Sequence, residues 1–275
     1  MDGRPVRRYR AAVVGLGKIG WLADQDDRRP RPRSHVSAWE FCPGAELVAA
    51  IEIDSDKRKE FLAACPDVTV FPSFSHLCAS GFEIPDIVSL ALPPSEHRVY
   101  VEVCAQAKVP LIICEKPLAT SSKDAHAMVE ACRASGTILL TNHGRRFHPM
   151  IQAVKADLDK GRIGRPLSAV AVYSGGLWTD GSHMVDLLRW FLGDVLWASG
   201  QRRGPCAEDG VEPSYDAHLW FRADITASLH VVDIRRYVRF DLTIFGEEGI
   251  LALDEAGLRA RWGKAEASYP LAGGY

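Results

Sequence analysis

Apolar residues follow two different patterns along this chain. Up to about residue 144, short unbroken runs of Val, Ile, Leu and Ala alternate with amphipathic stretches that open with Asp or Ser. Unbroken apolar runs are typical of parallel strands covered on both faces, and Asp or Ser caps the free amides at a helix start. The alternation predicts an α/β fold with a doubly wound parallel sheet. We expect strands at 9–15, 46–53, 86–92, 109–114 and 137–141, and helices at 56–65, 95–107 and 122–135.

From Arg145 onward, strands follow one another with only two helices, expected at 150–158 and 182–192. In the stretch 238–245, apolar residues alternate with Arg, Asp and Thr, so one face of that strand is apolar. The pattern predicts a second α/β domain with a largely antiparallel sheet that has one open face, and this face is a surface for assembly into a homodimer or tetramer. The predicted domains are 1–144 and 145–275. Further strands are expected at 167–173, 217–221, 227–232, 238–245 and 250–254.

Composition and charge exclude several classes of protein. Lys+Arg 33 against Asp+Glu 35 gives a formal net charge of -2, which leaves no basic surplus for binding nucleic acid. No window reaches the ~18 consecutive apolar residues of a membrane-spanning helix. The cysteines are odd in number and include no C-x-x-C pair, so we expect buried thiols in a reducing cytoplasm rather than disulfides or a metal site. The charged, proline-rich segment 24–33 predicts a mobile loop.

A glycine motif, G-x-G-x-x-G, follows the first predicted strand directly. Gly15 permits a tight turn, Gly17 lets a pyrophosphate approach the backbone, and Gly20 allows close packing of the next helix. The amides and dipole of that helix favour an anion. The motif, completed by Lys18 and Ile19, therefore predicts dinucleotide binding, and a glycine-rich turn without a ligand is the alternative.

Glu52 stands at the end of the second predicted strand, where an acid accepts hydrogen bonds from the adenosine ribose hydroxyls. It lies further from the glycine motif than the ~20 positions that are usual, and the segment 24–33 accounts for most of the excess. A carboxylate there repels a ribose phosphate, so NAD is favoured over NADP. Asp54 is a competing candidate, and an exposed strand-end carboxylate is the alternative for Glu52.

Two further strand ends carry candidate residues. In this fold class, ligands bind at the carboxyl edge of the parallel sheet. Glu115 and Lys116 follow one strand directly, and an ammonium there stabilises the alkoxide that develops as hydride leaves. Taken singly, a solvated lysine is the alternative. Another strand ends before a Pro-Pro turn, where a plain helix start capped by Ser95 is the alternative to cofactor contacts from Leu92, Pro93, Pro94 and His97.

His183 opens the second amphipathic helix of the C-terminal half, and its near-neutral pKa suits a general base. Asp186 lies on the same helix face at i+3 and either orients the imidazole or binds a metal with it. A histidine on the helix surface is the alternative. Aromatic faces and arginines suit a sugar-like ligand, and the candidates are Arg145, Arg146, Tyr173, Trp178 and Arg189.

Five motifs occur in one order along the chain. They are the glycine motif, PDIVSLALPP at 85–94, EKPL at 115–118, NHGRRFHP at 142–149, and Gly175-Gly176 followed by GSHMVD at 181–186. This combination resembles the glucose-fructose oxidoreductase / inositol dehydrogenase (Gfo/Idh/MocA) family over about residues 10–254. The resemblance implies a Rossmann domain and hydride transfer between NAD(P) and a ring carbon of a sugar or cyclic polyol. It also implies that Lys116 is the catalytic lysine and that His183 shuttles the substrate proton.

The chain departs from that family at Thr179, where many members carry an Asp four positions before the histidine. Asp180 is one residue away and is a candidate N-cap of the helix. The chain also ends at Tyr275, earlier than typical members, so a terminal strand is expected to be missing. Two rivals remain: a lyase or glycosidase that oxidises its substrate transiently with bound NAD, and a non-catalytic NAD-binding regulator. The expected substrate-contacting residues are Arg146, Trp178, Thr179, Asp180 and Asp186.

Overall fold

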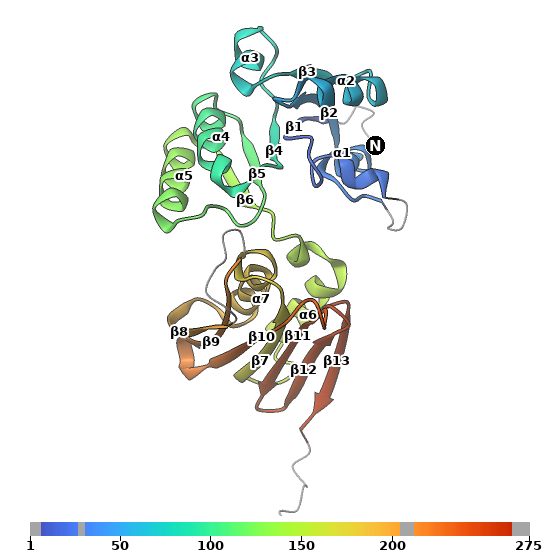
Figure 1. Ribbon diagram of the computed structural model, residues 1–275. Coiled ribbons are helices and arrows are strands. Elements are labelled where there is room, and N and C mark those ends of the chain that lie inside the picture. Colours follow the sequence, from blue (N-terminus) through green and yellow to red (C-terminus); the bar gives the residue numbers. More distant parts are fainter. Residues whose placement is uncertain (1–6, 27–30, 204–211, 266–275) are drawn as a thin grey trace, which may run out of the picture. The chain divides into compact units, whose positions relative to one another are not determined.

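The computed structural model describes residues 7–26, 31–203 and 212–265. The chain divides into two compact units, Met1–Asn142 and His143–Tyr275. The division falls just before the domain boundary predicted at residue 144. Each unit contains a sheet and a core of its own (Figure 1).

The first unit is built on a six-stranded sheet in the order β3-β2-β1-β4-β5-β6. All neighbouring strands pair in parallel, which confirms the doubly wound sheet. The strands are β1 (Tyr9–Val14), β2 (Ala45–Ile51), β3 (Thr69–Phe71), β4 (Ile87–Leu90), β5 (Leu111–Cys114) and β6 (Ile138–Thr141). The helices are α1 (His35–Glu40), α2 (Ser55–Ala64), α3 (Phe74–Ala79), α4 (Pro94–Gln106) and α5 (Ser122–Ser135), with a short 3₁₀ helix, η1 (Leu22–Gln25).

Continuous apolar sequence produces these strands because both faces of the sheet are covered. The last four residues of β1 are buried, and α4 and α5 contribute Val101, Cys104 and Met128 to the same core as β4. The elements β3, α3 and α1 were not predicted, since elements of three to six residues carry too little periodicity to be recognised.

The second unit is built on a seven-stranded sheet in the order β13-β12-β11-β7-β10-β9-β8. Only β7 and β10 pair in parallel, which confirms a largely antiparallel sheet. The strands are β7 (Pro166–Ser174), β8 (Val195–Arg203), β9 (Ser214–Phe221), β10 (Thr226–Val232), β11 (Phe240–Gly246), β12 (Gly249–Asp254) and β13 (Arg259–Lys264). The other elements are the 3₁₀ turns η2 (Gly144–Phe147) and η4 (Arg222–Asp224), the π-helical turn η3 (Leu177–Gly181), and the helices α6 (Pro149–Asp159) and α7 (Ser182–Leu192).

Helices α6 and α7 cover one face of this second sheet (Figure 1). Ile151 of α6 and Leu187 of α7 pack in one core with inward residues of β7 and β11, such as Ala171 and Leu242. Strands β8 and β13 were not predicted, because their sequences are mostly polar and their side chains largely exposed or half-buried. Strand β11 begins at Phe240, so the predicted start at Val238 is wrong, and that side chain is 75% exposed.

Several local expectations need correction. Asp24, at the start of the predicted mobile loop, is buried and hydrogen-bonded to Ser34 and Ser37, whereas residues 27–30 of that loop lie outside the described residues. Ser95 does not cap α4, which starts with Pro94 at its first position. Cys78 is exposed rather than buried, and Cys206 and Tyr275 lie outside the described residues.

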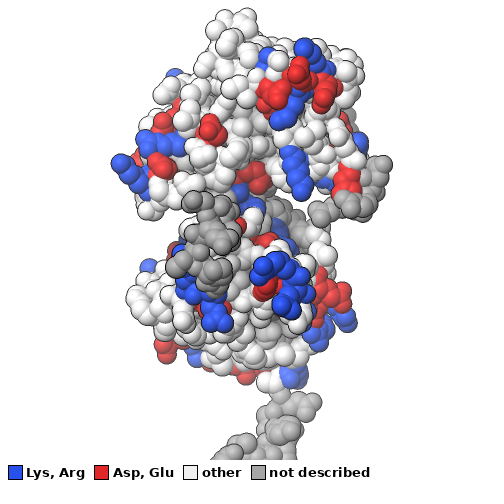
Figure 2. Space-filling view, viewed as in Figure 1, with Lys and Arg blue, Asp and Glu red and all other residues white. Residues whose placement is uncertain are grey.

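The surface carries charges of both signs. Lys and Arg side chains lie interspersed with Asp and Glu on the face that Figure 2 shows. Among the described residues, no helix is long and apolar enough to cross a membrane.

Candidate active site

The glycine motif forms a tight turn that follows β1 in the chain and lies against the residue that follows β4. Gly15 has a φ of +90°, and a Cβ there would lie 2.6 Å from the carbonyl oxygen of Ala91. A Cβ on Gly20 would lie 1.9 Å from the carbonyl oxygen of Gly15. Both positions therefore require glycine for packing within the protein. Gly17 differs, because a Cβ there would meet no protein atom within 4 Å.

The helix expected directly after the motif is replaced by turns and η1. The amide of Trp21 donates to the carbonyl oxygen of Gly17 at 3.0 Å, and α1 begins only at His35. The start of α1 then returns to the motif, since the amide of His35 donates to the oxygen of Ile19 at 3.0 Å. The segment 24–33 separates the turn from its helix in sequence, and the backbone bond restores their contact.

Glu52 is buried and joins the end of β2 to the glycine motif. Its Oε2 accepts a hydrogen bond from the amide of Leu16 at 2.8 Å, and its Oε1 accepts one from the amide of Asp54 at 3.0 Å. An exposed strand-end carboxylate is therefore the wrong interpretation of Glu52, which is 8% exposed. Asp54, the competing candidate, caps α2 through the amides of Asp56 and Lys57.

His97 is fully buried under the turn that follows β4. Its Nδ1 lies 3.0 Å from the carbonyl oxygen of Leu118, and its Nε2 lies 2.9 Å from that of Leu92. The imidazole therefore holds together the turns after β4 and β5, which corrects the expectation that His97 contacts a cofactor directly. Pro93 is exposed and Pro94 half-buried at the start of α4, with Leu92 half-buried beside them.

Glu115 and Lys116 follow β5, as the sequence predicts. Oε1 of Glu115 lies 3.1 Å from Nε2 of His35 and accepts from Nδ2 of Asn142 at 2.6 Å, while Oε2 accepts from the amide of Lys116 at 3.3 Å. Burial raises the pKa of the Glu115 carboxyl, but the hydrogen bonds from His35 and Asn142 outweigh burial and the pKa is lowered. Glu115 is thus an ionised acceptor beside the lysine.

A pocket of about 180 Å³ in the first unit brings these groups together. Ile19 of the glycine motif, His35 of α1 and Glu115 all line it, along with Asn142 at the end of β6. The structure thus joins the glycine motif to the Glu115-Lys116 turn, two sites that the sequence analysis identified separately. No role was predicted for His35 or Asn142 from the sequence.

His183 stands in the first turn of α7, directly after the π-helical turn η3. The backbone of Gly181 is already helical, and its amide donates to the oxygen of Gly176 at 3.0 Å. The expected N-cap at Asp180 is therefore wrong, because η3 continues into α7 without a capping side chain. The rings of His183 and His143 meet edge to face with centroids 5.3 Å apart.

Asp186 forms an ion pair with Arg146, whose Nε lies 2.6 Å from Oδ2. The Arg146 guanidinium also lies over the ring of Trp190. Within the described ranges, no group of three or more His, Cys, Asp or Glu residues is arranged to hold a metal ion. The charge of Asp186 is thus balanced by Arg146, which the sequence predicts as a substrate contact.

Thr179 has an acidic partner that the sequence analysis missed. Its amide donates to Oε1 of Glu212 at 2.7 Å, and its hydroxyl donates to Oε2. A Cβ on Gly176 would lie 2.0 Å from Cδ of Glu212, so glycine at that position leaves room for the carboxylate. The fold therefore places a carboxylate against Thr179. Glu212 precedes β9, and no local pattern connects it with Thr179.

The candidate sugar-contacting residues separate by environment. Tyr173 is buried and donates to the oxygen of Tyr215 at 2.7 Å, so it is a core residue and not a ligand contact. Arg189 pairs with Asp194. Trp178 is 48% exposed on η3 and remains available to a ligand.

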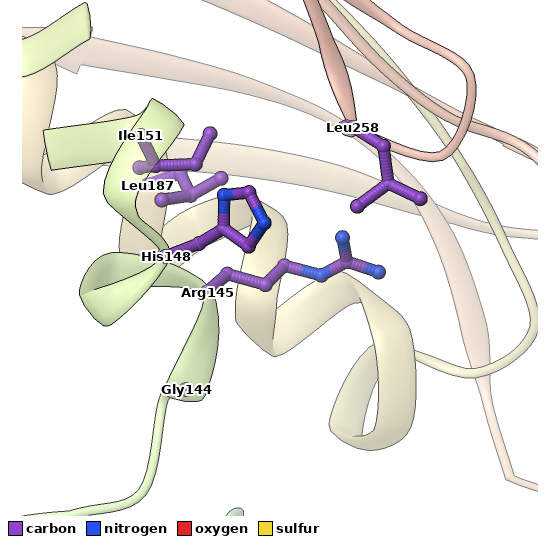
Figure 3. Close-up of a pocket in the computed structure, with 7 residues that line it drawn as sticks. Gly144, Arg145, His148, Ile151, Leu187 and Leu258 are labelled. Atoms are coloured by element: carbon purple, nitrogen blue, oxygen red, sulfur yellow. The ribbon is translucent and has the colours of Figure 1, made fainter. Parts of the chain in front are cut away.

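Arg145 lines a second pocket of about 230 Å³, shown in Figure 3, together with His148 and Leu258. Its guanidinium stacks 3.8 Å from the ring centroid of Phe240, and Nη1 donates to the oxygen of Ala256 at 2.7 Å. Burial lowers the pKa of Arg145, and the nearby Asp180 charge opposes that shift. These contacts give Arg145 a role in fixing the turn between β12 and β13.

Comparison with known families identifies both units. Residues 9–143 match the family model described as an oxidoreductase family with an NAD-binding Rossmann fold, and residues 151–252 match the GFO/IDH/MocA C-terminal domain. The chain belongs to the Gfo/Idh/MocA oxidoreductase family. This finding confirms the resemblance drawn from the five motifs and the NAD-binding class of the first unit.

The names of similar proteins in this family refer to sugars and polyols. An inositol 2-dehydrogenase of Acidothermus cellulolyticus is 30% identical over 264 residues, covering 90% of this chain and 73% of that protein. A D-apiose dehydrogenase of Paraburkholderia graminis is 32% identical over 207 residues, covering 69% of this chain and 51% of that protein. The chain thus spans about half the length of the D-apiose dehydrogenases that it matches.

A solved structure supports the same relationship. The WlbA dehydrogenase of Bordetella pertussis, in complex with NADH and UDP-GlcNAcA, superposes with a TM-score of 0.81 at 26% identity. The superposition covers 94% of this chain and 78% of that one.

Proposed function

We propose that this protein is an NAD-dependent dehydrogenase or reductase that transfers a hydride between nicotinamide and a ring carbon of a sugar or cyclic polyol. The observation that carries the proposal is the first-unit pocket, in which Ile19 of the glycine motif and Glu115, the neighbour of Lys116, line one space. The glycine motif would hold the cofactor, and Lys116 follows a residue that lines the same pocket. The names of the relatives indicate the substrate class.

The residues around the glycine motif fit a dinucleotide. Gly15 and Gly20 are required by close packing, whereas a Cβ on Gly17 would meet no protein atom within 4 Å, which would leave its backbone open to a pyrophosphate. Both oxygens of Glu52 accept backbone amides, and each carboxylate oxygen keeps a further lone pair for a ribose hydroxyl. The same negative charge repels a ribose phosphate, which favours NAD over NADP.

Two side chains carry the chemistry in this proposal. NAD, when bound, accepts or returns the hydride. The Lys116 ammonium donates a hydrogen bond to the reacting substrate oxygen and stabilises the negative charge that develops there. An imidazole nitrogen of His183 takes the hydroxyl proton during oxidation and returns it during reduction. The two residues belong to different units, and their joint action on one substrate is part of the proposal.

The second unit contributes the substrate contacts. Trp178 is exposed and offers an aromatic face to the C–H surface of a sugar. Thr179 and Asp180 lie beside it on η3, with Glu212 bonded to Thr179. Arg146 and Asp186 bind one another, so they support the α7 segment that carries His183 rather than form the first contacts to substrate.

A substrate screen tests the proposal. The purified protein is denatured to assay released nicotinamide cofactor, and then cyclic polyols, aldoses and sugar acids are screened by nicotinamide absorbance. We expect at least one of these compounds to reduce added NAD⁺. Product formation with bound cofactor that is never consumed would instead indicate the transient-oxidation lyase or glycosidase. Cofactor binding without conversion of any compound would indicate the regulator.

The proposal also includes a cytoplasmic location and assembly of the protein into a homo-oligomer. The sheet face opposite α6 and α7 exposes Val170, Phe245 and Ile250, which lie on neighbouring strands β7, β11 and β12. Exposed apolar side chains on one sheet face suit contact with a second copy. Light scattering in dilute buffer is expected to show a dimer or a larger species, and a monomer at all concentrations contradicts this assembly.

A further inference from the structure

His35, the first residue of α1, lies beside Glu115, 80 positions later in the chain. The two side chains are 10% and 14% exposed, and Nε2 of His35 is 3.1 Å from Oε1 of Glu115. A largely buried histidine and carboxylate in contact at one end of a parallel sheet need each other's hydrogen bond, because an unsatisfied buried polar group is costly. Glu115 also directly precedes Lys116 in the chain.

The carboxylate of Glu115 has a defined orientation. Its lowered pKa keeps it ionised, so it only accepts hydrogen bonds and Nε2 of His35 carries the proton between them. His35 and Asn142 both donate to Oε1, whereas the amide of Lys116 donates to Oε2. Because a carboxylate is planar and rigid, the two donors on Oε1 determine where Oε2 meets the backbone of Lys116.

The backbone of His35 is itself fixed against the glycine motif. Its amide donates to the oxygen of Ile19 at 3.0 Å. Ser34 caps α1 in a capping box with Ser37, and both hydroxyls donate to the buried carboxylate of Asp24. Asp24 is 6% exposed and is the first residue of the segment 24–33, which separates the motif from α1. A continuous chain of hydrogen bonds therefore runs from the glycine motif through His35 and Glu115 to Lys116.

We propose that His35 is a positioning residue for Lys116 that acts through Glu115 and couples the glycine motif to the lysine. The proposal rests on the proposed function, in which Lys116 stabilises charge on the substrate oxygen. Without the imidazole, Oε1 retains only Asn142, the carboxylate turns, and Lys116 moves with its backbone. A misplacement of ~1 Å in an active site costs on the order of 10²-fold in rate.

Three variants test this role through turnover. His35→Phe removes the donor, and His35→Gln retains a neutral N–H at similar reach. His126→Phe, at an exposed histidine of α5, is the matched control. We expect His35→Phe to lower kcat by roughly 10- to 100-fold, with substrate KM within about threefold. His35→Gln should recover kcat to within about fivefold of wild type, and the control should leave it unchanged. Should His35→Phe fail to fold by thermal melting, His35→Asn, whose shorter amide does not reach Glu115, takes its place.

A second readout does not depend on turnover. An amine-reactive reagent labels Lys116 and exposed Lys123, and mass spectrometry gives the ratio of their labelling rates. We expect His35→Phe to change this ratio at least about threefold, and His35→Gln to restore it. If wild type converts no sugar or polyol, the proposed function fails while the labelling ratio still decides the role of His35. Unchanged kcat and an unchanged ratio in His35→Phe, or equal losses in the Phe and Gln variants, overturn the positioning role.

Discussion

The two units hold their candidate residues in different ways. In the first unit, Lys116 follows a buried strand and its neighbour Glu115 is held by donors from two other elements. In the second unit, His183 follows a π-helical turn whose Thr179 is bonded to Glu212, a residue that precedes β9. The comparison indicates that the lysine follows directly from a strand of the sheet and is supported through Glu115, whereas the histidine segment is supported by Glu212, which lies in the connection that precedes β9. Substitutions should therefore distinguish the catalytic side chains from the residues that support them, and the supporting residues differ between the two units.

The largest effect is expected in the second unit, at His183. His183→Ala should lower turnover by roughly 10²–10⁴-fold, the range for loss of a general acid–base group, and should remove the acidic limb of the pH–rate profile. Steady-state kinetics across pH measure both. His230→Ala, an exposed histidine on β10, is the matched control and should leave both unchanged. Near wild-type turnover in His183→Ala would assign this histidine to structure alone.

Lys116→Ala should lower turnover by ~10²–10³-fold, as expected when one stabiliser of transition-state charge is lost. NADH affinity should change little, because the glycine motif and Glu52 hold most of the cofactor in the proposal. Lys116→Arg should remain impaired, since a planar guanidinium does not occupy the position of an ammonium. Turnover kinetics and NADH titration separate the two effects, and loss of NADH binding with turnover would contradict a purely catalytic lysine.

The glycine motif offers a matched pair within the first unit. Gly20→Ala forces a Cβ to 1.9 Å from a backbone oxygen and should cost about 1–3 kcal/mol of folding free energy, lowering Tm. Gly17→Ala has room for its Cβ and should keep Tm, but it should weaken NADH binding by roughly tenfold because it obstructs the pyrophosphate approach. Thermal melting and NADH titration measure the pair. Equal loss of stability, or wild-type NADH affinity in Gly17→Ala, would count against this division.

The smallest effect concerns cofactor choice at Glu52. Glu52→Ser should weaken NAD binding by a few fold and improve the relative binding of NADP, because the charge that repels a ribose phosphate is removed. Asp54→Ser is the control, since serine also caps a helix and the ratio should stay as in wild type. Titration of both nucleotides gives the ratio, and a wild type that prefers NADP contradicts the assignment.

The sequence by itself determined the features of this protein that depend on residues adjacent in the chain. Unbroken apolar runs produced β1, β4 and β5, because strands covered on both faces need apolar side chains throughout. The motif positions Gly15 and Gly20 were identifiable because the turn leaves no space for a Cβ. Lys116 was identifiable because it stands directly after an apolar strand and its neighbour Glu115, although its catalytic role stays a prediction.

Only the tertiary structure decided how polar groups distant in sequence compensate one another. His35 with Glu115, Arg146 with Asp186, and Thr179 with Glu212 are pairs that no periodicity or motif announces. The same holds for His97, which the sequence placed at a ligand edge and the fold buries between two carbonyl oxygens. A buried polar group is stable only with a partner, and the partner is chosen by which segments the fold brings together rather than by the residues beside it.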